Sequence, residues 1–212
     1  MTFVKKKHFS DIGSKDTYDK YIKGQYSNIS KLGKRRRIEE YQIVGQKISD
    51  IVDSSSYKSM ICLGSRNKWE GECFKGIFKD IDVKTLDLMP ESGCDYIYDY
   101  SKLPEEWENK WDIIYTNAPD HALDGEAAFY EWLRVLNAGG ILIFGISSQD
   151  LSGTEHTNDT TPLESCIYGT AQEVEAWFKS QKNIEIIKKF GPLFSDNEKT
   201  NGGFNYFILK KK

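Results

Sequence analysis

The sequence predicts an α/β protein built on an open, mostly parallel β-sheet, and three observations lead to that prediction. From residue 58 onward, apolar runs of strand length alternate with amphipathic segments of helix length, a pattern typical of parallel βαβ units. The first run ends at Gly64 just before a predicted helix, and open α/β sheets hold nucleotide-like ligands at such turns. Near the C-terminus two apolar runs follow one another without a helix between them, so we expect them to pair antiparallel.

Length and composition favour a single packed domain. A chain of 212 residues can bury roughly 70% of the surface that its unfolded form exposes. The hydrophobic share of 39% argues against a disordered chain. We expect residues 1–36 to form a polar, basic arm and residues 37–212 to form the α/β domain.

The charge pattern bears on the class of partner. The formal net charge is -3, so the whole chain has no electrostatic attraction to nucleic acid, although residues 5–7 and 34–37 are locally basic. No apolar run approaches the ~20 residues of a membrane helix, and the N-terminus lacks the apolar core of a signal peptide. The four cysteines lack paired metal-ligand spacing. We therefore expect reduced thiols, a cytoplasmic location, no metal, and a small-molecule substrate; no feature predicts the oligomeric state.

The elements of the first half follow from periodicity and turn residues. They are a short helix or arm up to about residue 30, an amphipathic helix at 38–51 ending in a turn at 53–56, a strand at 60–63, a helix at 69–78, a strand at 83–86, a short strand within 93–98, a turn or helical fragment at 103–107, and a strand at 112–116.

In the second half we expect a helix at 127–136, closed by residues 137–140, whose glycines supply the left-handed conformation that ends many helices. The unbroken apolar run at 141–146 predicts a buried central strand. A polar stretch at 147–162 is long enough to be a functional lid or a disordered loop. Thr170 is expected to cap a helix at 171–182, and strands at 184–190 and 204–209 close the sheet.

Taken together, these features resemble the class I S-adenosylmethionine-dependent methyltransferases over roughly residues 58–210. The most specific parts are residues 111–117, which look like the family's fourth strand, and residues 132–143, which look like its Leu-x-Pro-Gly-Gly turn with Ala138 in place of proline. The resemblance implies a Rossmann-like, seven-stranded, mostly parallel sheet with helices on both faces and one antiparallel strand in the closing pair. It also implies S-adenosyl-L-methionine as cofactor.

The glycine motif departs from the family pattern. Cys62, Arg66 and Lys68 stand where the family has an acidic residue and two further glycines. The planar fork of Arg66 could reach the cofactor's carboxylate, and Glu70 or Glu72 could restore the missing negative charge. The loop therefore either binds the cofactor in an altered way or does not bind it.

Carboxylates at the ends of the second and third strands are the natural ligands of a nucleoside. Asp87 could accept hydrogen bonds from both ribose hydroxyls, or it could serve only as a turn former. Asp99 could accept from the adenine amino group, or it could cap a turn; Tyr100 or Leu88 would cover the ring. The expected cofactor-binding set is Leu63, Gly64, Ser65, Arg66, Asp87, Leu88, Asp99, Tyr100 and Asn117.

The residues just past the fourth strand are expected to stand beside the transferred methyl group. His121 is the candidate general base because its ordinary pKa lies near neutrality, and Asp120 could orient it; alternatively, His121 caps or packs at the next helix. Residues 117–120 are similar to the Asn-Pro-Pro-aromatic motif of adenine amino-group methyltransferases, but they lack the second proline and the aromatic residue. A small-molecule acceptor is therefore expected over a flipped base. Asp112 is expected to make structural hydrogen bonds.

The function predicted from these residues is O- or N-methylation of a small molecule by in-line displacement. The divergent loop leaves open a non-enzymatic binding or scaffold protein with the same fold. A nicotinamide-dependent oxidoreductase would need Gly-x-Gly-x-x-Gly, of which the chain has only Gly64. A further hypothesis is that Tyr18, Tyr21, Tyr26 and residues 34–37 fold over the site as a lid.

Overall fold

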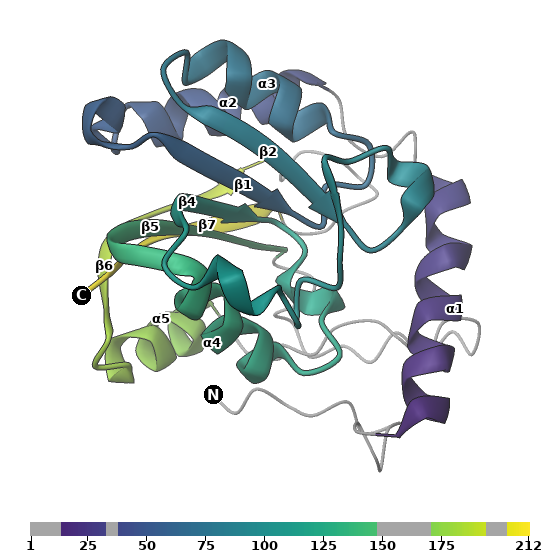
Figure 1. Ribbon diagram of the computed structural model, residues 1–212. Helices are drawn as coiled ribbons and strands as arrows, with labels where there is room; N and C mark the ends of the chain where they lie inside the picture. The colour runs from purple at the N-terminus through teal and green to yellow at the C-terminus, as the bar shows by residue number, and fades with distance from the viewer. Residues whose placement is uncertain (1–13, 33–37, 148–170, 194–202) are drawn as a thin grey trace.

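In a computed structural model, which describes residues 14–32, 38–147, 171–193 and 203–212, one seven-stranded sheet forms the centre of the protein (Figure 1). The strands are β1 (Ser59–Leu63), β2 (Asp82–Asp87), β3 (Tyr96–Ile97), β4 (Trp111–Thr116), β5 (Leu136–Ser147), β6 (Ile184–Leu193) and β7 (Phe204–Lys211). Their order in the sheet is β3-β2-β1-β4-β5-β7-β6. Strand β7 runs antiparallel to both neighbours, and the other pairs are parallel. The predicted sheet with one antiparallel strand is confirmed.

Helices cover both faces of this sheet. They are α1 (Lys15–Leu32), α2 (Ile38–Ser49), α3 (Trp69–Ile77), α4 (Gly125–Val135) and α5 (Ala171–Ser180), joined by the short 3-10 turns η1 (Ser54–Ser56), η2 (Pro90–Ser92), η3 (Glu105–Trp107) and η4 (Pro119–His121). Figure 1 shows α2 and α3 on one face, α4 and α5 on the other, and α1 beyond the end of the sheet toward which the arrows of β1 and β2 point. In the described part of the chain, no helix is both long and apolar enough to cross a membrane.

Strand β1 shows why this segment is apolar throughout. Successive side chains of a strand point to opposite faces, and both faces of this strand are covered. Met60 and Cys62 pack with α2 and α3, whereas Ile61 and Leu63 pack with α4 and α5. All four are fully buried. A polar residue at any of them would lie in one of the two cores.

Two glycines shape the link from β1 to α3. Gly64 ends the strand with a φ of 74°, a conformation that residues with a Cβ adopt at a cost. Gly71, in the first half of α3, packs against β2 so closely that a Cβ there would overlap the methyl group of Thr85. The absence of a side chain at Gly71 therefore sets how near α3 lies to the sheet.

The link between α4 and β5 differs from the prediction. The helix begins at Gly125, capped by the Asp124 carboxylate, and ends at Val135 rather than at the glycines. Residues 136–140 already belong to β5, and Gly139, with a φ of 75°, lies where the pairing of β5 with β4 shifts register. The left-handed glycine thus forms an irregularity within a strand and does not end a helix.

Other boundaries lie close to their predicted positions. Helix α5 ends at Ser180, and β6 and β7 extend three and two residues beyond their predicted ends. The polar stretch at 147–162, apart from its first residue, and Thr170 lie outside the described residues. Asp112 makes the structural contacts expected of it, because its carboxylate accepts from the backbone N–H groups of Lys58 and Ser59 and from the amide of Asn137.

Candidate functional site

A cavity lies at the carboxyl ends of the strands, where the turns after β1, β2, β3 and β4 converge. Parallel strands bring these turns to one edge of the sheet, which is where open α/β folds bind ligands. Helix α1 closes the cavity from outside. Its lining residues are Tyr21, Gln25, Gly64, Arg66, Asp87, Leu88, Met89, Asp99, Tyr100, Ala118 and His121.

The turn after β1 keeps a glycine-like backbone despite its unusual residues. A Cβ on Gly64 would lie 3.4 Å from the Tyr100 ring and 3.4 Å from the Ala118 methyl group, so the bare backbone faces the cavity. Lys68, directly before α3, has a φ of 63° and therefore adopts the conformation that a glycine would favour. Arg66, in contrast, adds a long charged side chain to the cavity lining. The divergence from the family pattern thus changes the side chains of this loop more than its path.

Asp87 ends β2 and is the most deeply buried carboxylate on the cavity lining, with 5% of its surface exposed. Its Oδ1 accepts a hydrogen bond from the Met89 N–H at 2.9 Å, so it does act as a turn former. Burial raises the pKa of this carboxyl, and the Met89 N–H and the positive charge of Arg66 oppose that rise. A desolvated carboxylate in this position is stabilised by any ligand that donates hydroxyl hydrogen bonds to it.

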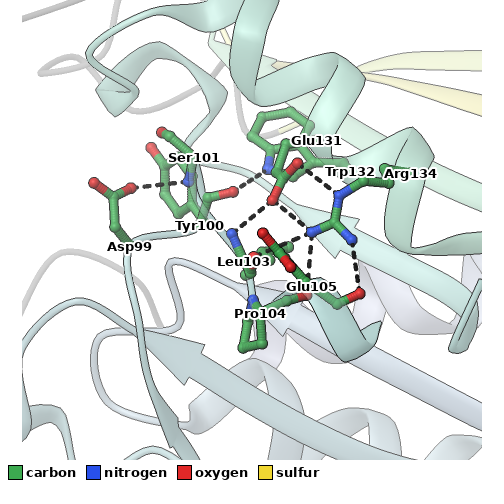
Figure 2. Close-up of polar contacts among 9 residues, drawn as sticks. All are labelled: Asp99, Tyr100, Ser101, Leu103, Pro104, Glu105, Glu131, Trp132 and Arg134. Atoms are coloured by element: carbon green, nitrogen blue, oxygen red, sulfur yellow. Dashed lines mark hydrogen bonds and ion pairs between the residues drawn. The ribbon is translucent and has the colours of Figure 1, made fainter. Parts of the chain in front are cut away.

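The loop after β3 places Asp99 and Tyr100 on the cavity lining. The Asp99 Oδ1 accepts from the Ser101 N–H at 2.8 Å (Figure 2). The Tyr100 hydroxyl donates to the Ala118 carbonyl at 2.8 Å, which ties this loop to the one after β4. Burial and the adjacent Asp99 carboxylate raise the pKa of Tyr18 on α1 to about 12. Asp99 therefore faces both the cavity and α1.

His121 reaches the cavity from η4 together with two charged neighbours. Its Nε2 lies 3.3 Å from Nη2 of Arg66 and 3.6 Å from Oδ2 of Asp120. A guanidinium can only donate, so the contact with Arg66 uses the Nε2 lone pair and places the proton of a neutral imidazole on Nδ1. Asp120 approaches this same nitrogen. The cap of the next helix is Asp124, not His121.

The cavity brings together most of the predicted site but not all of it. Predicted residues on its lining are Gly64, Arg66, Asp87, Leu88, Asp99, Tyr100 and His121. Leu63 points into the core, Ser65 is fully buried beside Cys94, and Asn117 lies against Gly145. Asp120 reaches the site only through His121. The roles in ligand binding or catalysis assigned to these four residues, and to those on the lining, stay predictions.

The lid hypothesis named Tyr18 and Tyr21 of α1, but sequence reasoning missed Gln25, which also lines the cavity. Tyr21, only 2% exposed, packs with Leu123 and the partly buried Leu88, and Gln25 lines the cavity one turn further along. The spacing of Tyr18, Tyr21 and Gln25 was the available signal, since it puts all three on one helix face. Tyr26, also named in the lid hypothesis, is 47% exposed, and residues 34–37 of that hypothesis lie outside the described residues.

The enclosed space is small, and Tyr21 and Gln25 of α1 form part of its lining. The cavity measures about 30 Å³, room for about two water molecules, whereas pockets for nucleotide-sized ligands span about 300–1,000 Å³. Figure 1 shows α1 as a separate arm beside this end of the sheet. Binding of a nucleoside therefore requires the lining to move, and we expect α1, which lies beyond the end of the sheet, to be the part that shifts.

Comparison with known proteins identifies the fold. No family model matches the sequence, and no curated protein is detectably similar to it. Among solved structures, a protein of Listeria monocytogenes assigned as an S-adenosylmethionine-dependent methyltransferase is 10% identical, with a TM-score of 0.58 over 80% of this chain and 99% of its own. The mitomycin 7-O-methyltransferase MmcR is 10% identical, with a TM-score of 0.56 over 82% of this chain and 54% of its own. The [4+2]-cyclase SpnF is 14% identical, with a TM-score of 0.57 over 80% of each chain.

Proposed function

We propose that this chain, which has the class I methyltransferase fold, transfers a methyl group from S-adenosylmethionine to a small molecule, by in-line displacement at oxygen or nitrogen. The observation that carries the proposal is the buried Asp87 carboxylate beside the bare backbone of Gly64, at the carboxyl edge of adjacent parallel strands. This pair offers a ribose acceptor and a close backbone approach in one place. Among the solved structures with this fold, one is named as a methyltransferase and another is assigned as an S-adenosylmethionine-dependent one.

The residues around the cavity fit this cofactor. Asp87 would accept from the ribose hydroxyls and Asp99 from the adenine amino group, while Tyr100 and Leu88 flank the ring. Arg66 would bind the carboxylate of the methionine part with its planar fork. When bound, the cofactor supplies a methyl group activated by a sulfonium leaving group. The protein's part is to align the acceptor with that group and to remove a proton where the acceptor carries one.

His121 is placed to take this proton. Its Nε2 becomes available when Arg66 turns from the imidazole to the cofactor's carboxylate. Asp120, 3.6 Å from the same nitrogen, then stabilises the imidazolium that forms. Arg66 thereby links the binding of the cofactor to the availability of the His121 Nε2 atom as a proton acceptor.

Several features favour a small-molecule acceptor. Residues 117–120 lack the aromatic side chain that would stack on a flipped base. The mitomycin 7-O-methyltransferase shows that a protein with this fold can methylate a small molecule.

The described cysteines, Cys62, Cys73 and Cys94, are free, which is consistent with a cytoplasmic protein.

Titration calorimetry with S-adenosylmethionine and with S-adenosylhomocysteine tests the proposal. We expect binding of both, and a loss of affinity of tenfold or more in Asp87→Ala, because the ribose hydroxyls lose a buried charged acceptor. Asp82→Ala is the matched control, since Asp82 lies on the same strand but is exposed. The absence of binding of either compound at millimolar concentration would reject the proposal.

The second candidate is a protein that keeps the fold without methyl transfer. The narrow cavity and the side chain of Arg66 within it favour this alternative. The [4+2]-cyclase SpnF shows that the fold is not confined to proteins named as methyltransferases. This candidate predicts that neither compound binds, or that S-adenosylmethionine binds without transfer of its methyl group to any acceptor.

A further inference from the structure

The loop that carries Asp99 and Tyr100 is fastened to α4 by side chains that the proposed reaction does not use. We propose that Glu131, Trp132 and Arg134 are positioning residues that hold this loop so that Asp99 reads the amino group of the cofactor's adenine. The inference rests on the proposed function and deepens it by naming what sets base selectivity.

The loop needs such support because it has little regular structure of its own. Residues 98–104 connect the two-residue strand β3 with η3, so most of their backbone groups lack a sheet or helix partner. Three side chains of α4 bond five backbone groups of this loop and of η3, as Figure 2 shows. These contacts do not serve α4 itself, because all five backbone groups lie outside that helix.

Glu131, Trp132 and Arg134 together form a clamp on this loop. Glu131 and Arg134 are its polar half. The guanidinium of Arg134 binds the carboxylate of Glu131 through two nitrogens, at 2.9 and 2.7 Å. The same carboxylate accepts from the Leu103 N–H at 2.7 Å. Nη2 of Arg134 also donates to the carbonyls of Leu103 and Pro104, both at 3.1 Å, and Nη1 donates to that of Glu105 at 3.3 Å. Only a planar fork with several donors can reach all of these oxygens at once.

Trp132 forms the apolar half and acts on Tyr100 directly. Its ring is fully buried, and its Nε1–H donates to the Tyr100 carbonyl at 2.9 Å. The two rings meet edge to face, with centroids 5.6 Å apart. Tyr100 is thereby held at its carbonyl, its ring and its hydroxyl, the last bonded to Ala118. Asp99, one residue earlier, is fixed between this anchor and its own bond to the Ser101 N–H.

Selectivity for adenine follows from this rigidity. A carboxylate accepts from the amino group of adenine but meets an oxygen acceptor in hypoxanthine, so a fixed Asp99 rejects the latter base. A loop that can relax would let the carboxylate turn away, and the two bases would then be bound more equally.

The test compares S-adenosylhomocysteine with its inosine counterpart by titration calorimetry, in the wild type, Arg134→Met and Arg134→Lys. Methionine keeps much of the apolar stem of Arg134 but none of its donors. We expect the wild type to prefer the adenine compound by about tenfold or more, as for one charged hydrogen bond. In Arg134→Met that preference should fall by at least threefold, because the adenine compound weakens while the inosine compound does not. Arg134→Lys should show a smaller loss.

Glu175→Gln is the matched control, because Glu175 forms a comparable helical ion pair with Lys179 on α5. An unchanged preference in Arg134→Met, or equal weakening of both compounds, would overturn the inference. Should Arg134→Met fail to fold, Glu131→Gln takes its place with the same expected change of preference. If the wild type binds neither compound, the proposed function fails and the inference fails with it. If the wild type binds both, the comparison tests only the positioning role of Glu131, Trp132 and Arg134.

Discussion

Truncation of Tyr21 should release α1 from the sheet while leaving the rest of the protein folded. Tyr21 is 2% exposed and packs chiefly with Leu123, beside the partly buried Ile22 and Leu88. Removing a large buried side chain costs about 3–5 kcal/mol in a full core, so about 2–3 kcal/mol is expected at this smaller contact. At 1.4 kcal/mol per tenfold change, Tyr21→Ala should raise the population of undocked α1 by about 30- to 140-fold. Trypsin cleavage after the exposed Lys23 should accelerate by that factor, since cleavage follows the open population.

The control is Tyr26→Ala, on the same helix but 47% exposed, which should leave the rate unchanged. Because Tyr21 lines the narrow cavity, Tyr21→Ala should also bind S-adenosylhomocysteine more tightly than the wild type. Equal cleavage of Tyr21→Ala and the wild type would refute the docking of α1. Weaker binding by Tyr21→Ala would show instead that α1 is a wall of the ligand site that need not move.

Three further predictions follow from single residues. The pKa of Tyr18 is raised from 10.0 to about 12, so the folded state holds this proton more tightly than the unfolded one. Docking of α1 should therefore weaken as pH rises from 10 to 12. Tyr18→Phe should abolish that pH dependence in ultraviolet titration and proteolysis. Lys68→Gly should stabilise the protein by about 0.5–1 kcal/mol in urea unfolding, because relief of a left-handed backbone outweighs the entropy cost of glycine; a loss of stability would contradict the strain. Gly71→Ala should destabilise by about 1–3 kcal/mol, since its methyl group overlaps that of Thr85, and Thr85→Ser should rescue it because serine keeps the 2.8 Å hydroxyl bond to Asp95; no rescue would refute the steric cause.

The sheet was predictable because its pattern is local. The apolar run at 60–63 and the unbroken run at 141–146 could only be buried strands, and two strands without a helix between them had to pair antiparallel. The positions of Gly64 and Asp87 at the ends of strands then followed from topology, so both lie on the cavity as expected.

What the sequence could not predict depends on contacts between distant segments. Spacing within the helix shows which residues share a face, but the burial of Tyr21 and the exposure of Tyr26 are set by where α1 lies against Leu123. Gly139 looked like the end of a helix because the pairing of β5 with β4 is not visible from its own neighbours. The pair Glu131–Arg134 reads in the sequence as an ordinary surface contact on a helix, although it supports a loop some thirty residues earlier in the chain.

The most direct test of the proposed cofactor site is a crystal structure of the protein with S-adenosylhomocysteine. The account predicts the ribose hydroxyls within hydrogen-bond distance of Asp87, the adenine amino group on Asp99, the sulfur facing His121, and α1 displaced from its position over the cavity. A ligand bound elsewhere, or ribose hydroxyls that make no contact with Asp87, would contradict it.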